Sequence, residues 1–252
     1  MPLKVVLFDF NGVILDDEPI HAQLIQDLML AENIRCSVED CQQFCLGRSD
    51  RACLQDLFHL RGRTVSQDYL SKLLIQKATA YRHRLATYNP LPIFPGVFEL
   101  IATFQSHHVK LGLVSGALRS EIEWVLHQAH LLSAFEILVT ADDIATSKPS
   151  PEGYRQAIAR FNGHYPDLNL VPADCLAIED SFPGLEAARS AGIPVVGVAH
   201  TYPFHMMQRR ANWAIDSLAD LEVQRLIQVF SGQDESLKSR YSEASGMVPP
   251  HE

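Results

Sequence analysis

Four short segments, far apart in the chain, carry side chains suited to phosphate chemistry. They contain Asp9, Ser115, Lys148 and the pair Glu179-Asp180. Three carboxylates gathered in one place would repel one another unless a cation neutralised them, and hard oxygen ligands with few protein donors suit Mg²⁺. A carboxylate nucleophile, a divalent metal and a lysine together provide a setting for phosphoryl transfer through an aspartyl-phosphate.

The elements between these segments decide whether they meet. Short apolar runs rich in β-branched residues predict buried strands over residues 5–8, 109–115, 137–140, 175–178 and 194–198. Segments with helical periodicity predict helices over residues 96–106, 118–129, 151–161, 183–191 and 218–230. This alternation predicts an α/β fold with a doubly wound (Rossmann-like) parallel sheet. Ligands of such sheets bind at the carboxyl ends of the strands, where the four segments lie.

One long interval breaks the alternation. Residues 17–88 hold three or four amphipathic helical stretches and no strand-like run, and a proline-rich segment from Asn89 to Gly96 leads the chain back. We therefore expect a small helical cap domain over residues 17–88, inserted after the first strand. The α/β core domain would then comprise residues 1–16 and 89–230, and residues 231–252, which are polar, are expected to form a disordered tail.

Composition limits the partners and the compartment. The chain of 252 residues has 21 basic and 30 acidic residues, a net charge of -9, which argues against binding nucleic acid through its phosphates. No window approaches about 18 uncharged apolar residues, so we expect no membrane span. The start of the chain has no basic-then-apolar leader, and five cysteines without a CxxC pair favour reduced thiols, so a cytoplasmic location is expected. The oligomeric state is left open.

The four segments resemble the motifs of a known family. Residues 9–14 (DFNGVI), 114–116 (VSG), 147–149 (SKP) and 178–181 (IEDS) look like the four motifs of the haloacid dehalogenase-like superfamily, in the same order. Residues 17–21 (DEPIH) and 46–49 (LGRS) resemble the helical-cap group that contains β-phosphoglucomutase and small sugar-phosphate phosphatases.

The resemblance implies a role for each motif residue. Asp9 would be the nucleophile that attacks phosphorus. The phosphoryl oxygens would be held by Ser115-Gly116, by Lys148 and by the loop after Asp9 that includes Gly12. Mg²⁺ would be bound by the Asp9 carboxylate, the Asn11 backbone carbonyl and Asp180, with Glu179 beside it. The rest of a small phosphorylated substrate would face the cap residues Arg48 and Arg51, together with His21 near the hinge.

Position 11 departs from the family pattern. Phosphatases and mutases of the family have an aspartate two residues after the nucleophile, which protonates the leaving oxygen and later deprotonates water, whereas this chain has Asn11. Loss of a positioned acid–base group typically costs about 10²- to 10⁴-fold in rate. Four explanations stay open: a slow phosphatase, a substrate whose leaving group needs no proton, a superfamily activity other than ester hydrolysis, and an engineered substitution.

These observations favour one function over three others. We expect a Mg²⁺-dependent phosphatase-like hydrolase, a phosphoric monoester hydrolase slowed by Asn11. A β-phosphoglucomutase-type sugar phosphomutase is the first alternative, but Asp50 stands where those mutases have an arginine for a second phosphate. A catalytically silent phosphate-binding regulator is the second. A dehalogenase is also conceivable, although the Glu179-Asp180 pair favours phosphate chemistry.

Overall fold

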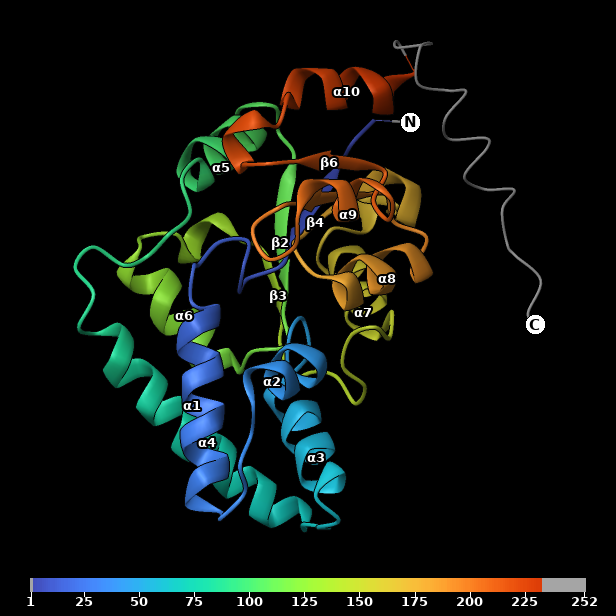
Figure 1. Ribbon diagram of the computed structural model, residues 1–252. Helices are drawn as coiled ribbons and strands as arrows, with labels where there is room; N and C mark the ends of the chain where they lie inside the picture. The colour runs from blue at the N-terminus through green and yellow to red at the C-terminus, as the bar shows by residue number, and fades with distance from the viewer. Residues whose placement is uncertain (1, 233–252) are drawn as a thin grey trace.

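The computed structural model describes residues 2–232, so the tail predicted beyond residue 232 lies outside the described residues. Six parallel strands form one sheet in the order β3-β2-β1-β4-β5-β6 (Figure 1). In chain order they are β1 (Val5–Phe8), β2 (Lys110–Val114), β3 (Ile137–Val139), β4 (Cys175–Glu179), β5 (Val195–Val198) and β6 (Trp213–Ile215). The predicted doubly wound α/β fold is confirmed.

Two layers of helices cover the sheet because the strands alternate their buried side chains. Val6 and Phe8 pack into a cluster with α5 (Val97–Ser106), α6 (Arg119–Gln128) and α10 (Val223–Ser231). Val5 and Leu7 point to the other face and pack with α7 (Glu152–His164), α8 (Phe182–Ser190) and α9 (Phe204–Gln208). Figure 1 shows α5 and α6 on one side of the sheet and α7 and α8 on the other.

Three details differ from the sequence-based expectation. Strand β6 and helix α9 were not predicted, because three and five residues are too short to show a period. The last helix begins at Val223 because residues 218–220 form a separate 3₁₀ turn capped by Ser217. It ends at Ser231, which the sequence pattern places in the tail.

Residues 18–85 form a helical insertion between β1 and β2. It consists of α1 (Glu18–Ala31), α2 (Val38–Phe44), α3 (Asp50–Leu60) and α4 (Gln67–Leu85). These helices enclose an apolar cluster of their own, with Leu54, Phe58 and Leu74 among its buried members. Figure 1 places all four at one end of the sheet. Within residues 2–232, no helix is long and apolar enough to cross a membrane.

One pair of cysteines is oxidised, although the sequence favours reduced thiols. The turn between α2 and α3 brings the Cα atoms of Cys45 and Cys53 to 4.7 Å, and the two form a disulfide. The expectation that all thiols are reduced is therefore wrong for this pair. Cys36, Cys41 and Cys175 remain free thiols.

Candidate active site

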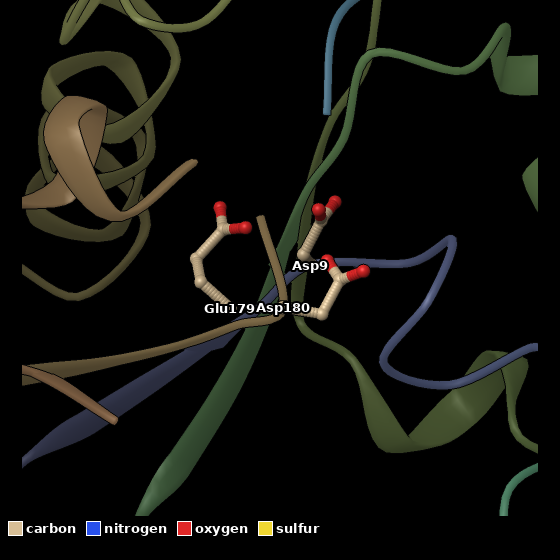
Figure 2. Close-up of side chains that lie close together, drawn as sticks. All are labelled: Asp9, Glu179 and Asp180. Carbon is tan, nitrogen blue, oxygen red and sulfur yellow. The ribbon is translucent and has the colours of Figure 1, made fainter. Parts of the chain in front are cut away.

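Three carboxylates meet where two central strands end. Asp9 follows β1 directly, Glu179 is the last residue of β4, and Asp180 comes next. Because β1 and β4 are neighbours in parallel register, the three side chains leave the sheet at the same edge (Figure 2). All three are buried, with one oxygen of each lying within 4.8 Å of the others. The chain turns to β2 on one side of β1 and to β4 on the other, so this edge is the switch point where open α/β sheets bind ligands.

Lys148 bridges two of these carboxylates. Its Nζ lies 2.9 Å from Asp9 Oδ1 and 2.7 Å from Glu179 Oε1. Burial opposes the charged form of this lysine, but the two carboxylates outweigh it and raise its pKa above the usual value. The Tyr154 hydroxyl donates a hydrogen bond of 2.5 Å to the same Glu179 oxygen. Lys148 is therefore held as a cation beside Asp9.

One lysine does not neutralise three buried carboxylates. Burial, followed by repulsion from Asp9, raises the pKa of both Glu179 and Asp180 well above the usual range. Glu179 Oε2 is buried and has no hydrogen-bond partner among the described residues. A divalent cation would relieve this repulsion, so these residues fit the Mg²⁺ that the resemblance of the motifs implies.

Two glycines allow the carboxylates to approach the backbone. Gly12 has a φ of +75°, and a Cβ there would lie 2.0 Å from Asp180 Oδ2. At Gly184, in the first turn of α8, a Cβ would lie 1.9 Å from Glu179 Oε2. A side chain at either position would displace a carboxylate of the cluster.

The segment after β2 forms a second wall of the site. Ser115 is buried, and its Oγ accepts a hydrogen bond of 3.1 Å from the backbone N–H of Ala117. Gly116 lies against the insertion, because a Cβ there would be 2.9 Å from the backbone nitrogen of Ser49. That nitrogen also donates a hydrogen bond of 2.7 Å to Ser147 Oγ, next to Lys148. The loop between α2 and α3 is thus docked on the strand ends.

A cavity of about 340 Å³ lies between this loop and the sheet edge. Among the residues singled out from the sequence, the cavity is lined by Asp9, Asn11, Gly12, His21, Arg48, Gly116 and Lys148. Arg51 does not line the cavity. Its guanidinium group donates hydrogen bonds to Gln67 and Ser71 instead. Ser115, Glu179 and Asp180 are buried and do not line the cavity.

A buried polar network that the sequence reasoning missed holds Asn11. Its Nδ2 donates a hydrogen bond of 2.7 Å to Asp17 Oδ2 and lies 3.0 Å from Nε2 of His21. The Tyr81 hydroxyl donates a short hydrogen bond to the same Asp17 oxygen. On the other side of the imidazole, Lys77 Nζ lies 2.5 Å from Nδ1 of His21.

Lys77 extends the network across the insertion. It forms ion pairs with Asp50 at 2.6 Å and with Glu121 of α6 at 3.4 Å. A sequence signal was present, because Lys77 falls on the apolar stripe of α4, which contains Leu70, Leu73, Leu74, Ala78 and Tyr81. A lysine on such a stripe is buried and needs acidic partners.

Two further residues at the cavity come from the loop after β5. The Thr201 hydroxyl donates a short hydrogen bond to Asp180. The His200 ring stacks on Phe94 with 3.8 Å between the ring centroids, and its Nδ1 lies 2.8 Å from the carbonyl oxygen of Gly12. No sequence pattern marked this loop, because it contacts the site only through the fold.

The haloacid dehalogenase-like hydrolase family matches residues 3–192, which include Asp9, Ser115, Lys148, Glu179 and Asp180. The chain belongs to the haloacid dehalogenase-like hydrolases. This confirms the resemblance of the four motifs and makes the protein a hydrolase of a family with named phosphatases, consistent with a phosphoric monoester hydrolase.

Relatives of known name cover most of the chain. A phosphorylated carbohydrates phosphatase of Thermotoga maritima is 29% identical over 201 residues, covering 79% of this chain and 87% of the relative. The β-phosphoglucomutase of Bacillus subtilis is 28% identical over 204 residues, covering 80% of this chain and 85% of the relative. The relatives thus include phosphatases and phosphomutases.

Solved structures share the fold. A β-phosphoglucomutase from Clostridium difficile superposes with a TM-score of 0.77 and 23% identity, covering 92% of this chain and 98% of that one. A mutant of CbbY from Rhodobacter sphaeroides in complex with xylulose-1,5-bisphosphate gives a TM-score of 0.74 with 23% identity, covering 88% of this chain and 97% of that one. At these identities the likeness establishes the fold alone.

Proposed function

We propose that the protein is a Mg²⁺-dependent phosphatase-like hydrolase that removes phosphate from a small phosphorylated metabolite through an aspartyl-phosphate on Asp9. The observation that carries this proposal is the ion pair between Asp9 and Lys148, built into a carboxylate cluster at the switch point of the sheet. A buried carboxylate that ends a strand beside a fixed ammonium group is suited to attack an electrophilic phosphorus.

The two carboxylate oxygens of Asp9 have different surroundings: one is held by neighbouring groups and the other has no partner in the described part of the chain. Oδ1 forms an ion pair with Lys148 Nζ at 2.9 Å and accepts a hydrogen bond of 2.7 Å from the backbone N–H of Phe10. Oδ2 has no hydrogen-bond partner among residues 2–232, so it is the oxygen we assign to the in-line attack. The bond between Oδ2 and phosphorus forms as the bond from phosphorus to the leaving oxygen breaks, while Lys148 stabilises the charge on the phosphoryl oxygens. Water then hydrolyses the acyl-phosphate and regenerates Asp9.

A divalent metal would be held by Asp9 and Asp180 together with the backbone carbonyl of Asn11. Glu179 would lie beside the ion, because its Oε1 is already engaged by Lys148 and Tyr154. When bound, the ion would supply positive charge to the phosphoryl group. Thr201 would keep Asp180 oriented for this task, and Gly12 would keep the loop close.

The helical insertion would act as a cap over the substrate. Its docked loop and the sheet edge enclose the cavity, which would exclude water while the organic part of the substrate binds. We therefore propose residues 17–88 as a cap domain and residues 1–16 and 89–230 as the core domain.

A direct test is phosphate release from an aryl phosphate with and without Mg²⁺. An aryl leaving group departs with little protonation, so Asn11 does not limit this assay. We expect Mg²⁺-dependent turnover that is lost in Asp9→Asn, which keeps the shape of the side chain. Turnover that survives in Asp9→Asn would contradict the proposal.

A phosphomutase is the less favoured alternative. It needs a second phosphate clamp in the insertion, but Asp50 faces the cavity there and is paired with Lys77. Neither nearby arginine replaces the clamp, because Arg48 binds Asp56 at 2.7 Å and Arg51 lies outside the cavity. Conversion of a sugar phosphate to its isomer without release of free phosphate would favour the mutase.

The presence of Asn11 also favours a catalytically silent phosphate-binding regulator. An amide transfers no proton, so such a protein would bind Mg²⁺ and phosphate without turnover. The retained set of Asp9, Lys148 and Asp180 argues for the enzyme instead. Binding of both ions with no hydrolysis of the aryl phosphate would favour the regulator.

A further inference from the structure

The lining of the cavity is rich in carboxyl groups. Lys148, the ammonium group beside the nucleophile, is itself paired with Asp9 and Glu179. Besides Asp9, the lining contributes three more carboxyl groups, from Asp16, Glu18 and Asp50. A ligand therefore meets more acidic than basic groups in this cavity.

The other cations in or beside the cavity are already engaged. Arg48 donates hydrogen bonds to Asp56 at 2.7 Å and to the carbonyl oxygen of Phe44 at 3.2 Å. Lys77 pairs with Asp50, and His21 contacts Asp17, whose negative charge compensates it. Burial lowers the pKa of His200, so this ring adds no charge at neutral pH. Among the described residues that line the cavity, no unpaired cation remains for a second anionic group.

The carboxylates, by contrast, retain acceptor capacity. The Glu18 carboxyl group forms no hydrogen bond or ion pair with any residue between 2 and 232, although it lines the cavity. Burial raises the pKa of Glu18 to about 7, so near neutral pH this group both accepts and donates hydrogen bonds. Asp50 uses Oδ2 for Lys77, while its Oδ1 lies 3.9 Å from the nearest His21 nitrogen, beyond hydrogen-bond distance. Hydroxyl or ammonium groups of a ligand would satisfy these oxygens.

From this arrangement we propose that Glu18 and Asp50 are specificity-determining residues that select phosphate monoesters rich in hydroxyl or amino groups and reject those with a second phosphate or a carboxylate. The inference rests on the proposed phosphatase function. A second anion would lie against the Glu18 carboxyl group and the free Oδ1 of Asp50 in a partly desolvated cavity, where like charges are unfavourable. The Arg48–Asp56 ion pair adds to this selectivity, because it keeps the guanidinium group that lines the cavity from binding a second anionic group of the ligand.

The test compares matched ligands as competitive inhibitors of aryl phosphate hydrolysis. Fructose 6-phosphate is paired with fructose 1,6-bisphosphate, and glycerol 3-phosphate with 3-phosphoglycerate, so that each pair differs by one anionic group. We expect the chain to bind the less charged member roughly tenfold or more tightly in both pairs. In Glu18→Gln and Asp50→Asn this preference should fall toward equality.

Two further variants separate local recognition from overall charge. Asp56→Asn releases Arg48 and should strengthen binding of the more anionic member only. Asp68→Asn removes the same charge from an exposed position of α4 away from the cavity, and it should leave the preference unchanged. Asp50→Asn removes the partner of Lys77 and can prevent folding. In that case Glu18→Gln alone tests whether the cavity carboxyl groups cause the preference for the less charged ligand.

Equal binding of both members by the unchanged chain would overturn the inference. The same holds for a preference that Glu18→Gln does not move, or that Asp68→Asn moves equally. If no aryl phosphate is hydrolysed, the proposed function fails, and titration calorimetry with the same ligand pairs then measures the preference independently of turnover.

Discussion

The Asn11 amide is held by Asp17 and His21, so position 11 does more than lack an acid. Its amide nitrogen donates to Asp17, a fully buried carboxylate that also accepts from Tyr81. A carboxylate at position 11 would therefore face another carboxylate at hydrogen-bond distance. Two such groups share a proton, which raises the pKa of the pair.

Asn11→Asp is accordingly expected to restore a general acid. For an alkyl phosphate, the rate should rise by about 10²- to 10⁴-fold, since the leaving oxygen needs the proton. For an aryl phosphate the gain should be much smaller. Phosphate release from both esters checks this prediction.

The double variant Asn11→Asp/Asp17→Asn provides the matched control. It exchanges the two side chains while keeping one carboxylate in the network, so it should retain the gain and fold at least as stably as the single variant. No gain on the alkyl ester in either variant would contradict the assigned role of position 11.

At the scale of elements, Asp143 ties the loop after β3 to two helices. Its carboxylate binds Arg119 of α6 and Arg160 of α7, each at 2.7 Å, and accepts a hydrogen bond from the backbone N–H of Thr140. Partial burial opposes ionisation, but the Arg160 and Thr140 hydrogen bonds prevail and lower the pKa of Asp143 to about 2. These contacts position the segment that leads to Lys148.

This pKa predicts an acid-dependent loss of stability. A carboxyl group whose pKa is lowered in the folded state stabilises it above the unfolded pKa of about 4, and that contribution disappears as the pH falls toward about 2. Asp143→Asn should therefore lower the free energy of unfolding by about 2 kcal/mol at pH 7. Urea unfolding from pH 7 to pH 2 measures it. A deficit that persists undiminished at pH 2 would contradict this explanation.

The whole molecule depends on how the insertion meets the sheet. Gly47, with a φ of +69°, packs so closely that a Cβ would lie 2.2 Å from Ser181 Oγ. Gly47→Ala should therefore displace the docked loop from the strand ends and open the cavity. Gly62 has the same φ but no neighbour within 4 Å, so Gly62→Ala is a control for backbone strain alone.

We expect Gly47→Ala to lower kcat/KM on the aryl phosphate by roughly tenfold or more, because the closed arrangement excludes water and completes the site. Gly62→Ala should change kcat/KM little, and it should lower the free energy of unfolding less than Gly47→Ala does, because it adds backbone strain without a clash. Equal activity of the two variants would show that docking of this loop does not matter for catalysis.

The sequence predicts the fold and the strand-end residues well because short motifs and strong periodicity are local features. Asp9, Lys148 and the Glu179-Asp180 pair meet at the sheet edge because the topology of a parallel sheet dictates it. The cavity walls were less predictable. The partners of Arg48 and Arg51, the Cys45–Cys53 disulfide and the Lys77 network depend on how the helices of the insertion pack, which residue spacing does not specify.

The most direct test of the account is to look for the phosphoryl group on Asp9. The unchanged chain would be mixed with Mg²⁺ and an aryl phosphate, quenched in acid and analysed by intact-protein and peptide mass spectrometry. Because Asn11 should slow the activation of water, we expect a fraction of chains heavier by one phosphoryl group, located on Asp9 and absent in Asp9→Asn. Multiple turnovers with no adduct in the unchanged chain, or the same adduct in Asp9→Asn, would contradict it.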